Sequence, residues 1–314
     1  IEPDHQWAIL ELGMNRPGEI RRLGEICSAD IGLITNIGPA HLEGLGSLEG
    51  IMEAKGELIE TISANGTMIF NADDPLVMRL AKRARCQTVL FGQTPAAEIR
   101  ASSLTPDPQG VSFRLHMPQG ERQIHLPVPG SFNVSNALAA AAVGTCLEIG
   151  LDEIQAALQS FSPVNGRLNV LELSNEVHLI DDTYNANPAS VKAAISTLTG
   201  ISGKQRRIAV LGDMLELGTA SAGLHREVGC FAGQSDLDKL FITGQFAADV
   251  AQGAQECGLA SENIFQGSKE DIFARLTQIV APKDWILVKG SRGMRMETLV
   301  QALRAKHGNV ENLS

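Results

Sequence analysis

The chain has 314 residues, of which 44% are hydrophobic and 20% are charged, as in an ordinary soluble globular protein. This length predicts two domains, because single hydrophobic cores stop growing near this size. The net charge of −10 argues against a sequence-independent nucleic-acid binder, which needs a basic face, and against attraction to anionic membranes. No apolar run is long enough to span a bilayer, and the first residues lack a secretory signal, so we expect a cytoplasmic protein.

The five cysteines form no CxxC pair and lie in apolar or helical surroundings. We therefore expect reduced core thiols rather than disulfides or a zinc site. These residues are Cys27, Cys86, Cys146, Cys230 and Cys257.

The first half of the chain alternates short apolar runs with helical patterns, which is typical of a parallel sheet covered by helices. The expected strands are 7–12, 31–37, 67–71 and 88–91, and the expected helices are 17–27, 47–63 and 74–84. Between residues 99 and 128 apolar residues alternate with period two around turn residues, so we expect a small antiparallel element there. Two helices follow, at 134–147 and 151–161.

The segment 162–166, Ser-Pro-Val-Asn-Gly, is the predicted linker, because Pro and Gly interrupt both helical and strand patterns. We place the domain boundary at residue 165, which divides the chain into residues 1–165 and 166–314. The second part has expected strands at 169–173, 177–181, 206–211, 238–243, 263–265 and 285–288, and expected helices at 221–232, 245–257, 269–279 and 294–305. This alternation predicts a second α/β domain, doubly wound and Rossmann-like.

The stretch 181–190 contains six polar residues, follows an apolar strand and precedes a helical segment. Ligands of open α/β sheets bind at the carboxyl ends of the strands, so this stretch is a candidate site. The alternative is a polar loop that caps a helix, with Asn187 or Ser190 as the N-cap residue.

The helix expected at 47–62 places an apolar arc opposite an arc of glutamates. The apolar arc contains Leu48, Ile51, Met52, Leu58, Ile59 and Ile62, and the glutamates are Glu49, Glu53, Glu57 and Glu60. Lys55 falls in the middle of the apolar arc. Such a lysine extends its ammonium to solvent, pairs with a carboxylate, or loses its proton and becomes able to form a carbamate with carbon dioxide. Periodicity alone favours the first of these outcomes.

Two further polar residues follow or end apolar runs, Glu11 and His41. A carboxylate and an imidazole at adjacent strand ends are a candidate site for a divalent ion such as Mg²⁺. Taken singly, Glu11 is better explained as an edge residue and His41 as a helix-capping loop residue.

Asn133 and Asn136 lie one turn apart at the start of an alanine-rich helix, where amides either cap the helix or present a donor and an acceptor to a purine. Arg167, just after the linker, is placed to bind phosphate across an interdomain cleft, and the alternative is an ordinary surface residue. The segment 288–293, Val-Lys-Gly-Ser-Arg-Gly, is a candidate anion site at a strand end. The chain contains no GxxxxGK[ST] phosphate loop, since residues 202–205 have the wrong spacing.

Taken in this order, the motifs resemble those of the Mur ligase family. The matching segments are 11–15, 18–20, 36–46, 54–57, 71–74, 133–142, 166–167, 181–187, 211–218 and 289–292. The resemblance covers nearly the whole chain, and it is greatest to the members that join D-alanyl-D-alanine to UDP-N-acetylmuramoyl-tripeptide.

The resemblance implies a monomeric ligase that uses ATP and Mg²⁺ to activate the tripeptide carboxylate as an acyl phosphate, which the amine of D-alanyl-D-alanine attacks. It implies a metal site at Glu11, His41 and Lys55, with Lys55 carbamylated, and catalytic roles for His41, Lys55 and Arg167. The implied nucleotide contacts are Asn133 or Asn136 with adenine, Arg167 with phosphates, Asp182 with ribose, and Tyr184, Asn185 and Asn187 around the nucleotide. Lys289, Ser291 and Arg292 are the implied contacts to the peptide end of the substrates.

The chain departs from the family pattern at its start, because complete members carry a UDP-binding domain and a phosphate loop ahead of the segment that matches Glu11. We therefore expect an N-terminally truncated fragment, inactive by itself, whose central ATPase domain lacks the phosphate loop. Two rival hypotheses are a sister ligase for diamino acids or glutamate and a non-catalytic binding module. The diamino-acid ligases usually carry Asp-Asn-Pro-Arg, whereas this chain has only Asn187-Pro188-Ala189, which disfavours them.

Overall fold

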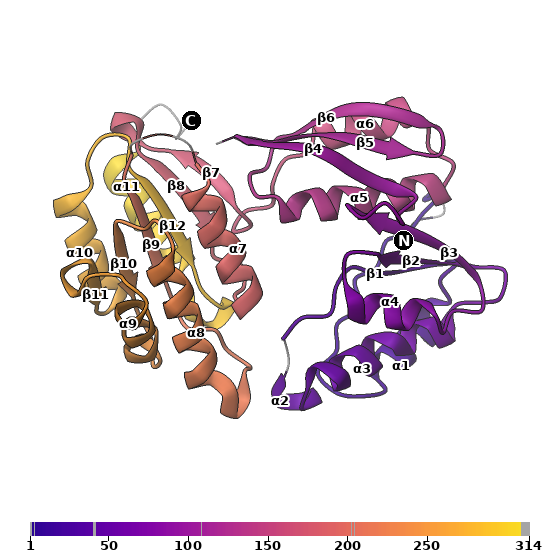
Figure 1. The fold of residues 1–314 in the computed structure, drawn as a ribbon, viewed down its shortest axis with the longest axis horizontal. Helices are drawn as coiled ribbons and strands as arrows, with labels where there is room; N and C mark the ends of the chain where they lie inside the picture. The colour runs from indigo at the N-terminus through magenta and orange to yellow at the C-terminus, as the bar shows by residue number, and fades with distance from the viewer. Residues whose placement is uncertain are drawn as a thin grey trace.

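The computed structural model describes residues 2, 4–39, 42–107, 109–201, 203 and 205–308, which form two six-stranded sheets, each with its own helices (Figure 1). The strands of the first sheet are β1 (Ile31–Ile34), β2 (Thr67–Asn71), β3 (Gln87–Gly92), β4 (Ile99–Asp107), β5 (Gly110–Met117) and β6 (Gly120–Leu126), in that spatial order. β1 to β4 pair in parallel, whereas β4, β5 and β6 pair antiparallel. The expected parallel sheet with an antiparallel element is therefore confirmed.

Helices cover both faces of the parallel part of this sheet. They are α1 (Glu19–Cys27), α2 (Leu42–Leu45), α3 (Leu48–Thr61), α4 (Pro75–Ala81) and α5 (Phe132–Cys146). One more helix, α6 (Leu151–Gln159), packs against the antiparallel strand β6. Side chains alternate along β2, so that Met68 and Phe70 pack in the core with α3 and α4, while Ile69 packs in the core with α5. Both cores are mainly aliphatic, and Phe70, Phe91 and Phe113 are their buried aromatic side chains.

The second sheet has the strand order β11-β10-β9-β12-β8-β7. Its strands are β7 (Asn169–Glu172), β8 (His178–Asp182), β9 (Arg207–Leu211), β10 (Lys239–Ile242), β11 (Ile264–Gln266) and β12 (Trp285–Lys289). All neighbours pair in parallel except β7, which runs antiparallel to β8. One core holds α7 (Pro188–Thr199), α8 (Ser221–Gln234) and α9 (Ala247–Glu256), and the other holds α10 (Lys269–Ile279) and α11 (Glu297–His307), so this domain is doubly wound as predicted.

The expected strand at residues 7–12 is absent. This segment makes no strand pairing, and Trp7, Ile9 and Leu10 are exposed. An apolar run forms a strand only where a neighbouring strand satisfies its backbone N–H and C=O groups. In the described part of the chain β1 is an edge strand, and residues 7–12 do not pair with it.

The predicted arcs of α3 are wrong at two positions. Leu48 of the apolar arc is 42% exposed, and Glu57 of the glutamate arc is buried. The carboxylate of Glu57 accepts hydrogen bonds from the backbone N–H groups of Gly18 (2.7 Å) and Arg21 (3.1 Å). Because Gly18, the N-cap residue of α1, has no side chain, Glu57 satisfies the free N–H groups of that helix from a different element.

Cys230 of α8 forms a disulfide with Cys257, which directly follows α9, and this corrects the expectation of reduced thiols. Glycines allow the two helices to approach closely: a Cβ on Gly229 would lie 2.1 Å from a carbonyl oxygen of α9, and one on Gly253 would lie 2.0 Å from a carbonyl oxygen of α8. The other three cysteines are free. Among the described residues, no helix is both long and apolar enough to cross a bilayer.

The two domains meet at the linker, at the segment before α5, where Val128 packs in the core with α7, and between α2 and the short helix η2 (Gly218–Ala220). A Cβ on Gly218 would lie 3.6 Å from the Cβ of Glu43 in α2. α6 ends at Gln159 and β7 begins at Asn169, and we keep residue 165 between them as the working boundary.

Candidate functional site

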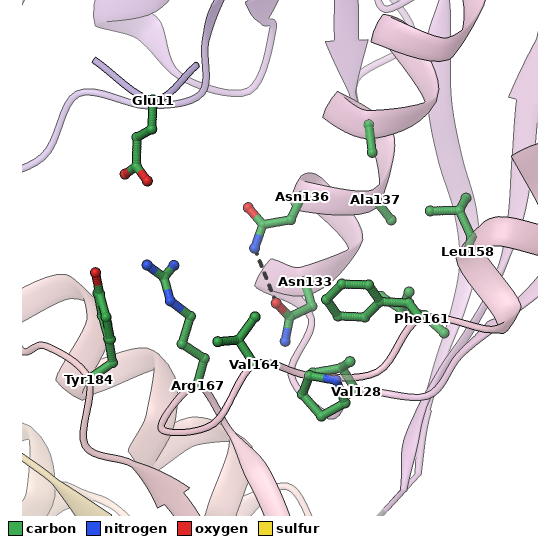
Figure 2. A pocket seen from close by; sticks show the side chains of 13 residues that line it. Glu11, Val128, Asn133, Asn136, Ala137, Leu158, Phe161, Val164, Arg167 and Tyr184 are labelled. Carbon is green, nitrogen blue, oxygen red and sulfur yellow. Dashed lines mark hydrogen bonds between the residues drawn. The ribbon is translucent and has the colours of Figure 1, made fainter. Parts of the chain in front are cut away.

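A cleft of about 450 Å³ lies beside the linker and is lined by residues of both domains (Figure 2). This volume suits a small-molecule ligand. Its apolar lining consists of Leu126, Val128, Ala137, Ala140, Leu158, Phe161, Pro163 and Val164. Its polar lining consists of Glu11, Asn133, Asn136, Arg167 and Tyr184, all predicted as site residues. The structure thus brings together five candidates that are far apart in the sequence.

Asn133 and Asn136 project into the cleft from the first turns of α5 (Figure 2). The side-chain amide of Asn133 donates to the carbonyl of Pro129 (2.8 Å), and that of Asn136 donates to Oδ1 of Asn133 (3.1 Å). Neither side chain caps α5, whose N-cap residue is Ser131. Asn136 is exposed, and its Oδ1 is directed into the cleft as an acceptor.

Tyr184 lies between two arginines on the side of the cleft formed by the C-terminal domain. The guanidinium carbon of Arg167 is 4.3 Å from the ring centroid of Tyr184, and that of Arg292 is 5.7 Å from it. Both distances fall within the range of cation–π attraction. The fork of Arg167 points toward Glu11 across the cleft (Figure 2), so a phosphate group there would meet a positive charge.

Polar side chains of the loop after β8 make hydrogen bonds to the backbone of the same loop. Asn187 is the N-cap residue of α7: its Oδ1 accepts from the N–H of Ser190 (2.8 Å), and Oγ of Ser190 accepts from the N–H of Asn187 (3.0 Å). The capping alternative therefore accounts for Asn187, and its predicted nucleotide contact stays a prediction. Asn185 is exposed but does not line the cleft.

Asp182 is buried and both of its carboxylate oxygens are engaged. Oδ1 accepts from the N–H of Leu168 (3.2 Å), and Oδ2 lies 2.6 Å from Nζ of Lys289. Burial raises the pKa of the Asp182 carboxyl above its ordinary value, while the Lys289 ammonium opposes this rise. Each oxygen can accept a further hydrogen bond, and the predicted contact between Asp182 and a ribose stays a prediction.

Lys289 and Ser291 face into the protein. Lys289 is 3% exposed and Ser291 is 4% exposed. Nζ of Lys289 also donates to the carbonyl of Asn185 (2.9 Å), and Oγ of Ser291 donates to the carbonyl of Ala186 (3.2 Å). These contacts go to the loop after β8, whereas Arg292 is exposed. The contact of these three residues with peptide stays a prediction.

The side chain of Lys55 reaches the backbone of a different segment, where its Nζ donates to the carbonyl of Asn36 (2.6 Å). Burial lowers the pKa of the Lys55 ammonium, and the negative charge of Asp74 partly offsets this effect. The Lys55 amine is therefore hydrogen-bonded, and its lowered pKa makes loss of a proton easier, as in the third of the outcomes considered above. Asn36 belongs to the segment that leads to His41, which itself lies outside the described residues.

The described residues suit a magnesium ion that arrives with a nucleotide. Mg²⁺ is usually bound by one or two protein carboxylates together with substrate phosphates and water. Glu11 supplies one carboxylate to the cleft, opposite Arg167 (Figure 2). No group of three or more His, Cys, Asp or Glu side chains able to hold an ion occurs in the described ranges.

The chain thus forms two α/β domains with a cleft between them, and comparison with known proteins specifies the family. Residues 1–144 match the Mur ligase middle domain, and residues 166–292 match the Mur ligase glutamate ligase domain. The chain belongs to the Mur ligase family.

Among its relatives is the UDP-N-acetylmuramoyl-tripeptide--D-alanyl-D-alanine ligase of Escherichia coli, 35% identical over 97% of this chain and 66% of the relative. A crystal structure of MurF from Acinetobacter baumannii has a TM-score of 0.89 at 32% identity, over 97% of this chain and 66% of that chain. A structure of MurF ligase from Thermotoga maritima in complex with ADP has a TM-score of 0.80 at 28% identity, over 93% and 65%. The chain thus spans just under two thirds of the length of each of these proteins.

Part of the cleft and part of its support were not predicted from the sequence. Phe161, Pro163 and Val164 were interpreted as a helix end and a linker, yet they form the apolar wall of the cleft. The signal was available, because Phe and Val are unusual in an exposed linker and indicate a covered or ligand-binding surface. The support that Glu57 gives to α1 had no local signal.

Proposed function

We propose that this protein is an ATP-dependent ligase that joins D-alanyl-D-alanine to UDP-N-acetylmuramoyl-tripeptide in peptidoglycan precursor synthesis. The observation that carries the proposal is the convergence of Glu11, Asn136 and Arg167 in one cleft between the domains. The similarity over both domains to a ligase of this specificity, and to a MurF ligase solved with ADP, supports it. We place the protein in the cytoplasm as a monomer.

The residues of the cleft suit an adenine nucleotide. The apolar wall with Phe161 and Val164 offers a dry surface to a flat base, and the amide oxygen of Asn136 can accept a hydrogen bond from an exocyclic amine. Arg167 would hold the phosphates by its planar fork. Tyr184, stacked against Arg167, fixes the direction of that guanidinium.

The proposed reaction proceeds in two steps. An oxygen of the tripeptide carboxylate attacks the γ-phosphorus of ATP, the bond to the β-phosphate oxygen breaks, and an acyl phosphate and ADP result. The amine of D-alanyl-D-alanine then attacks the acyl carbon, loses a proton, and inorganic phosphate leaves with its electron pair. Arg167 neutralises charge on the phosphates during the first step.

Mg²⁺, when bound, would neutralise charge on the transferring phosphoryl group. Glu11 and His41 are the residues proposed to hold it, and we propose that Lys55 supports the site as a carbamate. The lowered pKa of the Lys55 ammonium favours this modification, because only the neutral amine reacts with carbon dioxide. Lys55 also contacts the Asn36 carbonyl, which connects it to the segment carrying His41.

The proposal is tested by measuring ADP release from ATP by the protein in the form its gene encodes. We expect release that requires both UDP-N-acetylmuramoyl-tripeptide and D-alanyl-D-alanine, and a loss of about 10²-fold in kcat/KM for Arg167→Ala. The matched control is Arg114→Ala, an exposed arginine of β5 that is remote from the cleft lining. Preference for glutamate or a diamino acid would favour a sister ligase, and nucleotide binding without turnover would favour a binding module. Either result would refute the proposal.

A further inference from the structure

Lys289 is joined to the loop after β8 by the register of two neighbouring strands. β12 and β8 pair in parallel with Lys289 opposite Asp182. Nζ of Lys289 therefore reaches both Oδ2 of Asp182 (2.6 Å) and, beyond the strand end, the carbonyl of Asn185 (2.9 Å). The second contact is unnecessary for neutralising a buried carboxylate, and its effect is to fix the backbone of the loop.

The same carboxylate holds the end of the linker. Oδ1 of Asp182 accepts from the N–H of Leu168, the residue after Arg167. The N–H of Tyr184 donates to the carbonyl of Gly166 at 2.9 Å, so the loop and the linker are also joined directly. Gly166 has φ of +77°, a conformation that favours glycine. Arg167 and Tyr184 are thus carried on two segments that the Lys289–Asp182 pair connects.

Ser291 makes a second connection two residues further along the chain. Its Oγ donates to the carbonyl of Ala186 (3.2 Å) and accepts from the N–H of Leu215 (2.9 Å), and its own N–H donates to the carbonyl of Asp213 (3.0 Å). Ser291 therefore ties together the loops that follow β8, β9 and β12. Asn187 fixes the far end of the β8 loop as the N-cap residue of α7.

We propose that Lys289 and Ser291 are positioning residues, which hold the carbonyls of Asn185 and Ala186 so that Tyr184 and Arg167 face the cleft. This inference rests on the proposed function, because it assumes that the cleft takes a nucleotide. It replaces a direct contact with the peptide as the role of these two buried side chains. Arg292 is exposed and lies within cation–π distance of Tyr184, so it supports the same ring as Arg167 does.

The single tyrosine of the chain allows a direct test. Within these 314 residues, growth with 3-fluorotyrosine introduces one ¹⁹F nucleus, at Tyr184, whose NMR shift reports the ring's surroundings without any assay of activity. Three variants are compared with the unsubstituted chain: Lys289→Met combined with Asp182→Asn, Ser291→Ala, and Lys192→Met. The double variant removes both charges together, so that no unpaired charge is left buried. The control, Lys192→Met, removes a partly exposed lysine that pairs with Glu227 in the same domain.

We expect the ¹⁹F resonance of the double variant and of Ser291→Ala to move toward the position of free fluorotyrosine, while Lys192→Met leaves it unchanged. Titration with ATP and Mg²⁺ should then shift the resonance of the unsubstituted chain and of Lys192→Met. In the other two variants, binding of ATP should be weaker by about tenfold to a hundredfold, the range seen when supporting partners of binding groups are lost.

The two proposals fail in different ways. If the double variant folds and its free resonance coincides with that of the unsubstituted chain, Lys289 is only half of a structural ion pair and the positioning role is refuted. If Ser291→Ala also leaves the resonance unchanged, the role of Ser291 is refuted as well. If the free resonances move as expected but ATP shifts none of them, the positioning role stands and the nucleotide site is refuted.

Discussion

Replacing Gly44 by alanine is expected to disturb the contact between α2 and the segment 11–15, which contains the candidate metal ligand Glu11. Gly44 lies in α2, and a Cβ at this position would lie 2.0 Å from the carbonyl oxygen of Asn15 and 3.1 Å from its carbon. Both atoms belong to the backbone and cannot rotate away. α2 or the segment 11–15 must therefore move by more than about 1 Å to reach normal contact distance. That segment also carries Glu11, so the movement would displace this proposed metal ligand.

Overpacking of this kind costs about 1–3 kcal/mol, and each kcal/mol lowers Tm by about 2–4 °C in a protein of this size class. We expect Gly44→Ala to show this loss in urea unfolding and, in the ligase assay, to require a higher Mg²⁺ concentration for half-maximal rate. The matched control is Gly13→Ala in the same segment, where a Cβ meets no atom within 4 Å. If Gly44→Ala is as stable as Gly13→Ala and has the same Mg²⁺ requirement, the contact between the two segments does not position the site.

Three further predictions concern α1, Lys55 and the disulfide. Glu57→Gln should lower the free energy of unfolding in urea by about 1–2 kcal/mol, because two N–H groups of α1 lose a charged acceptor. The control Glu53→Gln, at an exposed position, should change it by less than about 1 kcal/mol. Equal losses in the two variants would refute the capping role of Glu57. Because the Lys55 pKa is lowered in the fold, the unfolded chain binds more protons than the folded chain between that lowered pKa and about 10.4. The free energy of unfolding relative to Lys55→Met should therefore rise with pH in this window. A difference in free energy that does not change with pH would contradict the lowered pKa. Replacing Cys230 and Cys257 by serine should cost about 3.5 kcal/mol, the loop-entropy value for a separation of 27 residues, and an unchanged unfolding midpoint would show that the bond does not form.

Most elements of the fold could be predicted because their signals are local. β2 and α10 have the bounds expected from the sequence, since the short apolar run of a buried strand and the period-3.6 pattern of a helix are visible within one segment. The prediction of a strand at 7–12 was wrong for the opposite reason. A strand there depends on a neighbouring strand, and the periodicity of the segment does not show whether one is present. The short helix α2 and the strand β4 were not predicted as separate elements, because each is defined mainly by its contacts with other parts of the chain.

The candidate site shows the same difference between local signals, which could be predicted, and contacts across the chain, which could not. The residue types of Glu11, Asn136 and Arg167 indicated chemistry, and the structure places all three in the cleft. The direction of a buried polar side chain could not be predicted, because it depends on which strands are adjacent. Lys289 is directed to Asp182 by the β8–β12 register, which joins residues 107 positions apart. Asn187 shows that a polar residue in a matching motif can have a purely local partner.

The central claim, ligation through an acyl phosphate, is tested most directly by following the oxygen atoms of the tripeptide carboxylate. The terminal carboxylate is labelled with ¹⁸O, and the reaction is run with ATP and D-alanyl-D-alanine on the protein in the form its gene encodes. We expect the inorganic phosphate to carry one ¹⁸O atom, because the oxygen that attacks the γ-phosphorus leaves with it. Amide formation with phosphate free of ¹⁸O, or ADP release without amide product, would contradict it.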